Sequence, residues 1–333
     1  MANKPLQMLS IGDITVDAFI RIKDAKVHCK LDTEQCELCV RFGDKIPYES
    51  VTIINGVGNA ANASVSAARL GVASGFLGVV GSDQNGEDCL EGVRKDNVDV
   101  SFCRKQEGTL TNYHYVLWYE AERTILVKHY EYDYSIPENM PVPEWIYLSS
   151  LGENSLPFHG EIATYLQNNK DVKLAFQPGT FQMKLGVEAL KGIYDRTEII
   201  FINKEEAQRI LGSESQDTKE LLAGMHALGP KIVVITDGRN GVSASDGKES
   251  FHVPMFPDRI PPVDRTGAGD ATASTTVAAL ILGLPLREAI TWGPINSMAV
   301  VEQVGAQKGL LTKAQMEELL ASAPADYKSV DIS

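Results

Sequence analysis

Asp264-Arg265-Thr266-Gly267-Ala268-Gly269-Asp270 is the stretch of sequence that decides the fold, because small residues lead here into a helical pattern that extends to Leu282. The backbone N–H groups of residues 267–269 can converge on one point, since small side chains let an anion approach closely. The dipole of the following helix adds positive potential at the same place. The stretch therefore predicts an anion hole, formed by Gly267, Ala268 and Gly269, at the N-terminus of a helix.

The last residue of this stretch, Asp270, falls in the first turn of the predicted helix. A carboxylate there can meet a hydroxyl group beside the bound anion and accept its proton as a general base. A simpler interpretation is also open. An acidic residue in a first turn stabilises the helix dipole by about 0.3–1 kcal/mol and needs no catalytic role.

Outward from this stretch, short apolar runs alternate with helical patterns along the chain. The runs that suit buried strands are 8–14, 76–80, 145–148, 172–176, 198–202 and 231–236, and the helical patterns include 60–70, 86–95 and 161–166. Such alternation is typical of βαβ units. We therefore expect an α/β fold with a doubly wound, mostly parallel sheet flanked by helices.

Two stretches, 18–54 and 111–134, break the alternation and contain half-buried strand patterns instead of helices. They can pair into a small β-sheet lid over an α/β domain that comprises residues 1–17, 55–110 and 135–333. The alternative is an ordinary extension of the main sheet, because sequential strands tend to be neighbours. We also expect a homodimer formed through the lid.

Composition excludes several classes of protein. The chain has 333 residues, a formal net charge of −13 and five cysteines. Without a basic block it lacks the charge that neutralises nucleic-acid phosphates. No apolar run approaches the roughly 18 residues of a membrane span, and no signal peptide is recognisable. We expect a cytoplasmic protein with reduced thiols and neither nucleic acid nor membrane as a partner.

A second glycine-containing motif is Gly56-Val57-Gly58-Asn59-Ala60-Ala61-Asn62, which follows an apolar run and precedes a helical pattern. Taken literally it is a dinucleotide fingerprint and indicates an NAD-binding oxidoreductase. However, it lies outside the first βαβ unit, and the amides of Asn59 and Asn62 suit a polyhydroxylated ligand. A glycine turn with Asn caps is the structural alternative.

These motifs together are similar to those of one family. Residues 264–270 resemble the DTxGAGD signature of ribokinase-like (PfkB) carbohydrate and nucleoside kinases, and 58–62 with 68–71 resemble their GGNAAN…ARLG signature. Three shorter stretches, 12–17, 203–206 and 236–241, resemble the first strand with its sugar-binding Asp, the NxxE motif and the TxGxxG turn. All five occur in the family's order.

The resemblance implies an ATP-dependent kinase that transfers the γ-phosphate to a primary hydroxyl group with the help of Mg²⁺. It makes Asp270 the general base beside the anion hole. The resemblance assigns acceptor binding to Asp17, Gly58, Asn59 and Asn62, Mg²⁺ and phosphate contacts through water to Asn203 and Glu206, and the nucleotide site to Thr236, Gly238 and Gly241. It also implies a K⁺ site at Asp264 and Thr266, with Val300, Gln303 and Gly305 in a second loop.

Several positions depart from the family pattern, among them Val57, Gln177, Arg265, Thr275 and the run 271–273. Val57 replaces a glycine, so its backbone must avoid positive φ or be strained. Gln177 stands where nucleoside-kinase branches have an acid. Arg265 replaces a small residue, and its side chain either adds a phosphate contact or is simply solvated.

A cluster of metal-ligand types occurs in the predicted lid: His28, Cys29, Cys36 and Cys39. Three thiolates and an imidazole can hold tetrahedral zinc. Against zinc, the adjacent His28 and Cys29 would point to opposite faces of a strand. Small apolar thiols in a hairpin are the other interpretation.

Among acceptors we favour a small sugar, as in ribokinases and fructokinases. A nucleoside acceptor stays open because Tyr113, Tyr115, Trp118 and Tyr119 of the lid can stack on a base, although aromatic residues at this spacing are commonly core residues. A sugar phosphate stays open because of the lid cations Lys45, Arg123 and Lys128. The remote alternatives are an NAD-binding oxidoreductase and a non-catalytic sugar-binding protein.

Overall fold

The structure, a computed structural model, describes residues 5–29, 36–119, 122–138 and 140–332. A nine-stranded sheet forms its centre, with the strand order β17-β16-β15-β14-β13-β12-β11-β1-β6. In chain order these strands are β1 (Met8–Ile11), β6 (Ser74–Leu77), β11 (Trp145–Leu148), β12 (Lys173–Phe176), β13 (Thr197–Asn203), β14 (Ile232–Thr236), β15 (Val242–Ser245), β16 (Ser250–Val253) and β17 (Val330–Asp331). Strands β6, β1, β11, β12, β13 and β14 are parallel to one another, whereas β15, β16 and β17 add an antiparallel edge. The predicted mostly parallel sheet is confirmed.

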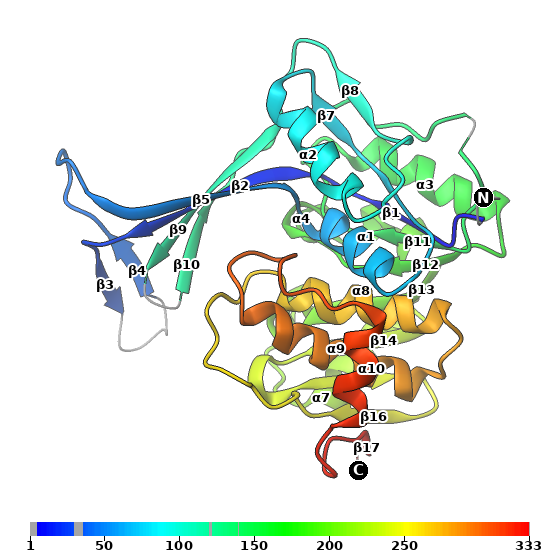
Figure 1. Cartoon of the computed structure of the whole chain (residues 1–333). Coiled ribbons are helices and arrows are strands. Elements are labelled where there is room, and N and C mark those ends of the chain that lie inside the picture. Colours follow the sequence, from blue (N-terminus) through cyan, green and yellow to red (C-terminus); the bar gives the residue numbers. More distant parts are fainter. Residues whose placement is uncertain (1–4, 30–35, 120–121, 139, 333) are drawn as a thin grey trace.

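Helices cover both faces of this sheet (Figure 1). One face carries α1 (Asn59–Arg69), α8 (Ala268–Ile281), α9 (Leu286–Val301) and α10 (Lys313–Ala321). The other carries α3 (Leu156–Asn168), α4 (Thr180–Ala189), α5 (Lys191–Tyr194), α6 (Lys204–Leu211) and α7 (Thr218–Ala227). Helix α2 (Gln84–Arg94) packs in a third cluster with α1. Short elements complete the body: β7 (Val79–Gly81), β8 (Arg104–Gln106) and the 3₁₀ turn η1 (Gly238–Asn240).

Strand β13 shows why the sheet is buried on both faces. Its side chains alternate, so that Ile199 and Phe201 pack with α8 and α9 while Ile200 and Ile202 pack with α3 and α7. An apolar run without polar alternation is what such a strand requires. The run 198–202 was recognisable in the sequence for this reason.

The two stretches that broke the alternation form a sheet of their own, with the order β10-β9-β2-β5, and are not an extension of the main sheet. Its strands are β2 (Thr15–Ile22), β5 (Tyr48–Val57), β9 (Asn112–Tyr119) and β10 (Glu122–Leu126). Strand β2 is antiparallel to β5 and parallel to β9. Figure 1 shows the long strands β2 and β5 leading away from the helices of the body. That residues 18–54 and 111–134 move as a lid stays a prediction.

A hairpin of β3 (Lys26–Cys29) and β4 (Cys36–Cys39) extends this sheet region, and Cys29 is joined to Cys36 by a disulfide. The expectation of reduced thiols is wrong here, because the hairpin register places the two cysteines opposite each other. Two of the three thiolates proposed for zinc are thereby bonded to one another. Within the described residues no group of three or more His, Cys, Asp or Glu side chains could hold a metal ion. In the same residues, no helix is both long and apolar enough to cross a membrane.

Candidate functional site

The predicted anion hole forms the first turn of α8. Gly267 precedes the helix with a φ of 82°, a left-handed conformation that favours glycine, and a Cβ atom there would collide with Ala306. Ala268 and Gly269 follow as the first helical residues, where N–H groups have no partner inside the helix. Glycine at position 267 is therefore needed both for the backbone turn and for the close packing against Ala306.

Asp270 lies one residue further along α8 and is 8% exposed. Its carboxylate accepts three hydrogen bonds from side-chain amides: from Asn59 Nδ2 at 2.8 Å, from Asn62 Nδ2 at 2.8 Å and from Gln177 Nε2 at 3.0 Å. Asn59 and Asn62 are in the first turn of α1, and Gln177 follows the end of β12. Tertiary packing thus gathers three amides from distant parts of the chain around one carboxylate.

Two further residues fix the direction of these amides. Gln307 Nε2 donates to the backbone carbonyl of Gly56 at 2.8 Å and to Asn62 Oδ1 at 3.0 Å. Since a carbonyl only accepts, Asn62 must turn its oxygen toward Gln307 and its nitrogen toward Asp270. On the other side the Tyr147 hydroxyl donates to Gln177 Oε1. Burial raises the pKa of Tyr147 well above its usual value, which keeps this hydroxyl protonated.

Sequence analysis missed Gln307 and Tyr147, and it treated Gln177 only as a departure from the family pattern. No local signal marks Gln307, which is 245 residues from its partner Asn62. Tyr147 lies in the buried strand β11, where an aromatic residue is ordinary core. Only the folded structure shows how the two residues are connected to Asp270. Gln307 acts through the Asn62 amide, and Tyr147 acts through the Gln177 amide.

A cleft of about 600 Å³ lies in front of Asp270, between the body and the lid sheet. It is lined by residues that the sequence predicted, namely Asp17, Gly58, Asn59, Asn62, Thr266, Gly267, Ala268, Gly269 and Asp270. Arg123, one of the lid cations considered for a sugar phosphate, also lines it. His114, His129, Phe181 and Lys184 line it as well and were not predicted for this site. We call this space the acceptor cleft.

Two carboxylates in and beside the acceptor cleft face histidines. Asp17 Oδ1 is 3.3 Å from His114 Nδ1, is buried and makes no hydrogen bond to any described residue. Asp13 is fully engaged, because His129 Nδ1 is 2.8 Å from Oδ2 and the Tyr134 hydroxyl donates to Oδ1 at 2.8 Å. Asp17 lines the acceptor cleft and Asp13 does not, so Asp17 is the carboxylate that can accept from a ligand hydroxyl there.

A second cleft, of about 580 Å³, opens on the other side of the anion hole. Asn203, Thr236, Gly238 and Gly241, all predicted for the nucleotide, line it at the ends of β13 and β14. The carboxyl ends of parallel strands are where ligands bind in such sheets. We call this space the nucleotide cleft.

Glu206 does not line the nucleotide cleft directly. It forms a capping box with Asn203 at the start of α6: Glu206 N donates to Asn203 Oδ1 at 2.7 Å, and Asn203 N donates to Glu206 Oε2 at 2.9 Å. Burial raises the pKa of Glu206, and the negative charge of Asp270 adds to this effect. Glu206 Oε1 makes no hydrogen bond to a described residue, so a carboxylate oxygen of the kind Mg²⁺ prefers is free near Asp270.

The structure brings together three of the residues predicted for a monovalent cation. Asp264 Oδ1 accepts from Thr266 N at 3.0 Å and Thr266 Oγ1 at 2.7 Å, while Asp264 Oδ2 accepts from Gly305 N at 2.9 Å. Val300 lies in the last turn of α9, and Gln303 follows that helix. These contacts connect the anion-hole loop to the loop after α9.

The glycine motif at 56–62 contains no strained valine. Gly56 and Gly58 have φ values of 78° and 119°, and Val57 between them does not. A Cβ atom at Gly58 would be 2.7 Å from the Asp13 carbonyl oxygen. The two glycines absorb the left-handed conformations, which is why a β-branched residue is tolerated at position 57.

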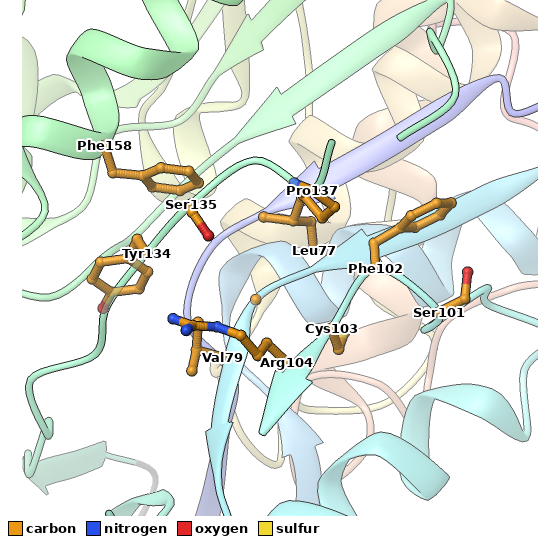
Figure 2. A pocket seen from close by; sticks show the side chains of 11 residues that line it. Leu77, Val79, Ser101, Phe102, Cys103, Arg104, Tyr134, Ser135, Pro137 and Phe158 are labelled. Carbon is orange, nitrogen blue, oxygen red and sulfur yellow. The ribbon is translucent and has the colours of Figure 1, made fainter. Parts of the chain in front are cut away.

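A third, smaller cavity of about 260 Å³ is seen in Figure 2, lined among others by Leu77, Phe102, Arg104, Tyr134 and Phe158. None of the residues predicted for catalysis or binding lines it. Tyr134, which lines this cavity, donates its hydroxyl to Asp13 beside the acceptor cleft.

Comparison with known proteins agrees with this geometry. The family described as pfkB family carbohydrate kinase matches residues 24–313. The chain is 24% identical over 260 residues to an ATP-dependent 6-phosphofructokinase of Thermoanaerobacterium thermosaccharolyticum, covering 75% of this chain and 80% of the relative. It is 27% identical over 272 residues to the ribokinase of Bacillus subtilis, covering 79% and 87%. A cytidine kinase of Thermococcus kodakarensis is 38% identical over 120 residues, 35% of this chain and 42% of the relative.

Solved structures share the fold at low identity. The ribokinase of Arabidopsis thaliana complexed with ribose and ATP superposes with a TM-score of 0.77 at 18% identity, covering 95% of this chain and 99% of the other. A putative ribokinase II of E. coli in complex with ATP and Mg²⁺ gives 0.72 at 20% identity, covering 95% and 99%. The family match and the named relatives define a sugar or nucleoside kinase, that is, a phosphotransferase. The chain belongs to the PfkB family of carbohydrate kinases.

Proposed function

We propose that this protein transfers the γ-phosphate of ATP to a primary hydroxyl group of a small sugar. The observation that carries the proposal is the meeting of the two clefts at the anion hole: Ala268 and Gly269 line both of them, with Asp270 directly behind on the acceptor side. Phosphoryl transfer needs donor and acceptor in line, with the transferred group between them. The two clefts provide that arrangement.

In the proposed mechanism Asp270 accepts the proton of the acceptor hydroxyl as the new P–O bond forms, while the bond from the γ-phosphorus to the β–γ bridging oxygen of ATP breaks and ADP leaves. Three amide donors hold its carboxylate in one orientation. The N–H groups of residues 267–269 stabilise the charge on the transferred phosphoryl group. The Asp17 carboxylate, which lines the acceptor cleft, accepts from a second hydroxyl of the sugar and fixes its position.

Mg²⁺ would be held near Glu206, whose Oε1 is free, and Asn203, through water. When bound, the ion supplies positive charge to the phosphates of ATP. Asn203, Thr236, Gly238 and Gly241 line the cleft that would take the nucleotide. The relative crystallised with ATP and Mg²⁺ supports this choice of donor and metal.

A sugar monophosphate is a second candidate acceptor. Arg123 and Lys184 line the acceptor cleft, and Arg123 Nε is buried without a hydrogen-bond partner among the described residues. The phosphofructokinase relative supports the same candidate. Of the other lid cations, Lys45 and Lys128 do not line this cleft, and Lys128 instead lies 4.7 Å from the ring of Tyr130.

A nucleoside acceptor has less support from the site. None of the four lid aromatics considered for base stacking lines the acceptor cleft. Tyr113 packs on Tyr115 with ring centroids 5.1 Å apart, and Arg21 lies 4.6 Å from the Trp118 ring. Phe181 is the aromatic residue that does line the cleft.

One assay tests these alternatives together. ADP release from ATP and Mg²⁺ is measured with ribose, fructose, fructose 6-phosphate and cytidine as acceptors, using wild-type protein and Asp270→Asn. We expect release that depends on an unphosphorylated sugar and is lost in the variant. Release with none of the acceptors would contradict the proposal, and release only with fructose 6-phosphate or with cytidine would replace the sugar by that class.

A homodimer through the lid is part of the proposal. Large apolar side chains are exposed on the lid strands and their connections, among them Phe42, Tyr48, Val51, Ile53 and Leu126. Patches of this kind mark protein interfaces. Light scattering would give twice the 36.3 kDa chain mass if the proposal holds and the chain mass if it does not.

A further inference from the structure

The acceptor and nucleotide clefts share three lining residues: Ala268, Gly269 and Arg265. Ala268 and Gly269 belong to the anion hole. Arg265 is the one charged side chain, among the residues the structure describes, that borders both spaces. Its guanidinium group is therefore carried by the loop at which the transferred phosphoryl group would pass from donor to acceptor.

Other cations line only one of the two clefts. Arg123 and Lys184 border the acceptor cleft, and Arg239 borders the nucleotide cleft. Backbone N–H groups supply partial charges, whereas the group in transfer spreads negative charge over three oxygens. A guanidinium offers a full charge and a planar set of donors that matches phosphate oxygens.

Arg265 is not committed to another partner that would hold it strongly. Its Nη1 atom is 3.1 Å from Oε1 of Glu122 on lid strand β10, and the two side chains are 49% and 68% exposed. An exposed pair of this kind contributes only about 0–1 kcal/mol. Glu122 can thus be exchanged for a phosphoryl oxygen when ligands are bound.

We propose that Arg265 is a catalytic residue that releases Glu122 and contacts the phosphoryl group during its transfer. The inference rests on the proposed function and adds a residue to it. It also gives the lid ion pair a role, because Glu122 holds the guanidinium beside the anion hole while no phosphoryl group is there.

The competing explanation is that Arg265 and Glu122 only hold the lid against the body. The two explanations differ in what Glu122→Gln does. If the pair merely holds the lid, Arg265→Ala and Glu122→Gln both remove the ion pair and should change turnover to a similar extent. If Arg265 contacts the phosphoryl group, Arg265→Ala removes the catalytic charge, whereas Glu122→Gln leaves it in place.

The test measures kcat and KM for ATP and for the best acceptor in the full chain. Arg265→Ala should lower kcat at least tenfold; arginines that contact the transferred group in other phosphoryl-transfer enzymes contribute about 10³–10⁵-fold. Glu122→Gln should keep kcat within about twofold, and Arg265→Lys, which keeps the charge, should lie between wild type and Arg265→Ala. Added guanidinium ion should restore part of the turnover of Arg265→Ala only.

Arg94→Ala is the matched control, because Arg94 is 48% exposed and pairs with Glu91 on the surface of α2. Its kcat should equal that of wild type. The inference is overturned if Arg265→Ala turns over like wild type, or if it and Glu122→Gln lose activity to the same extent. A wild-type protein that phosphorylates no acceptor would instead overturn the proposed function and this inference with it.

Discussion

Gln307 Nε2 lies 3.0 Å from Asn62 Oδ1, and this contact determines which end of the Asn62 amide faces Asp270. The same nitrogen donates to the Gly56 carbonyl, so the direction of the whole chain of hydrogen bonds is set by a backbone atom that only accepts. Gln307, near the C-terminal end of the chain, thereby positions the side chain of Asn62 in the first turn of α1.

Replacing Gln307 by Met should leave the Asn62 amide free to rotate and so misplace the Asp270 carboxylate. Because small displacements of reacting groups are costly, we expect kcat to fall by about 10²-fold with the KM for ATP unchanged. Gln315→Met is the control, since Gln315 caps α10 and its loss should reduce stability without changing kcat. Equal turnover of Gln307→Met and wild type would contradict the positioning role.

Asp270→Asn removes the basic carboxylate. It also places an amide where three side-chain amide groups donate hydrogen bonds. The NH₂ group of the new side chain must then face another N–H donor. We therefore expect thermal unfolding to show that the free energy of unfolding falls by about 1–3 kcal/mol. Turnover should fall by at least about 10²-fold, whereas ATP affinity should change little.

Ser274→Ala serves as the control for Asp270→Asn. The Ser274 hydroxyl is buried and donates to the Asp270 backbone carbonyl at 2.6 Å, so its removal alters the same turn of the helix without touching the carboxylate. Normal turnover in a folded Asp270→Asn protein would contradict the role of Asp270 as general base. Asp270 would then only stabilise the helix dipole.

The pH dependence of nucleotide binding should report on Glu206. Burial raises the pKa of this carboxyl group, so on acidification it takes up its proton at a higher pH than an ordinary Glu. Since Mg²⁺ prefers the ionised carboxylate, Mg²⁺-dependent ATP binding should be full above the raised pKa and be lost as the pH falls through it. Calorimetric titrations at several pH values check this. Glu206→Gln should bind weakly at every pH, and an identical pH profile in that variant would assign the effect to another group.

Potassium should activate the enzyme if the loop contacts of Asp264 form part of a cation site. Asp264 joins Thr266 to Gly305, and a cation bound beside it would stiffen the loop that carries the anion hole. We expect faster ADP release in K⁺ than in tetramethylammonium, and no such difference in Asp264→Asn. The same rate in both salts for the wild-type protein would remove K⁺ from the proposal.

Acceptor binding should order the two lid segments, residues 18–54 and 111–134. His114 and Arg123 of these segments line the acceptor cleft, so a bound sugar would contact both the lid and the body. Hydrogen exchange followed by mass spectrometry should slow in both segments when acceptor is present and stay unchanged in α7, which is remote from the cleft. Exchange that the acceptor does not alter in either segment would contradict a moving lid.

Local patterns were enough to predict much of the body. Strand β11 was predicted at its observed bounds, and α1 to within one residue, because apolar periodicity and glycine stop signals act within a few positions. Helix α3 begins at Leu156, five residues before its predicted start, since Pro157 is acceptable in a first turn where no N–H is needed. Lid strands were recognisable as strands, but their pairing into a separate sheet depends on contacts across about a hundred residues.

The sequence by itself determined the family, the alternation of strands and helices through much of the body, and the place of Asp270 in the helix turn that follows the small residues 267–269, because short motifs encode backbone turns and helix starts locally. Only the tertiary structure decided that Asn59, Asn62 and Gln177 all turn their amides to Asp270, that Gln307 and Tyr147 set those amides, and that Arg265 stands between the two clefts. The physical reason is that a hydrogen bond depends on atoms within about 3 Å of each other in space, and no spacing along the chain reports that distance.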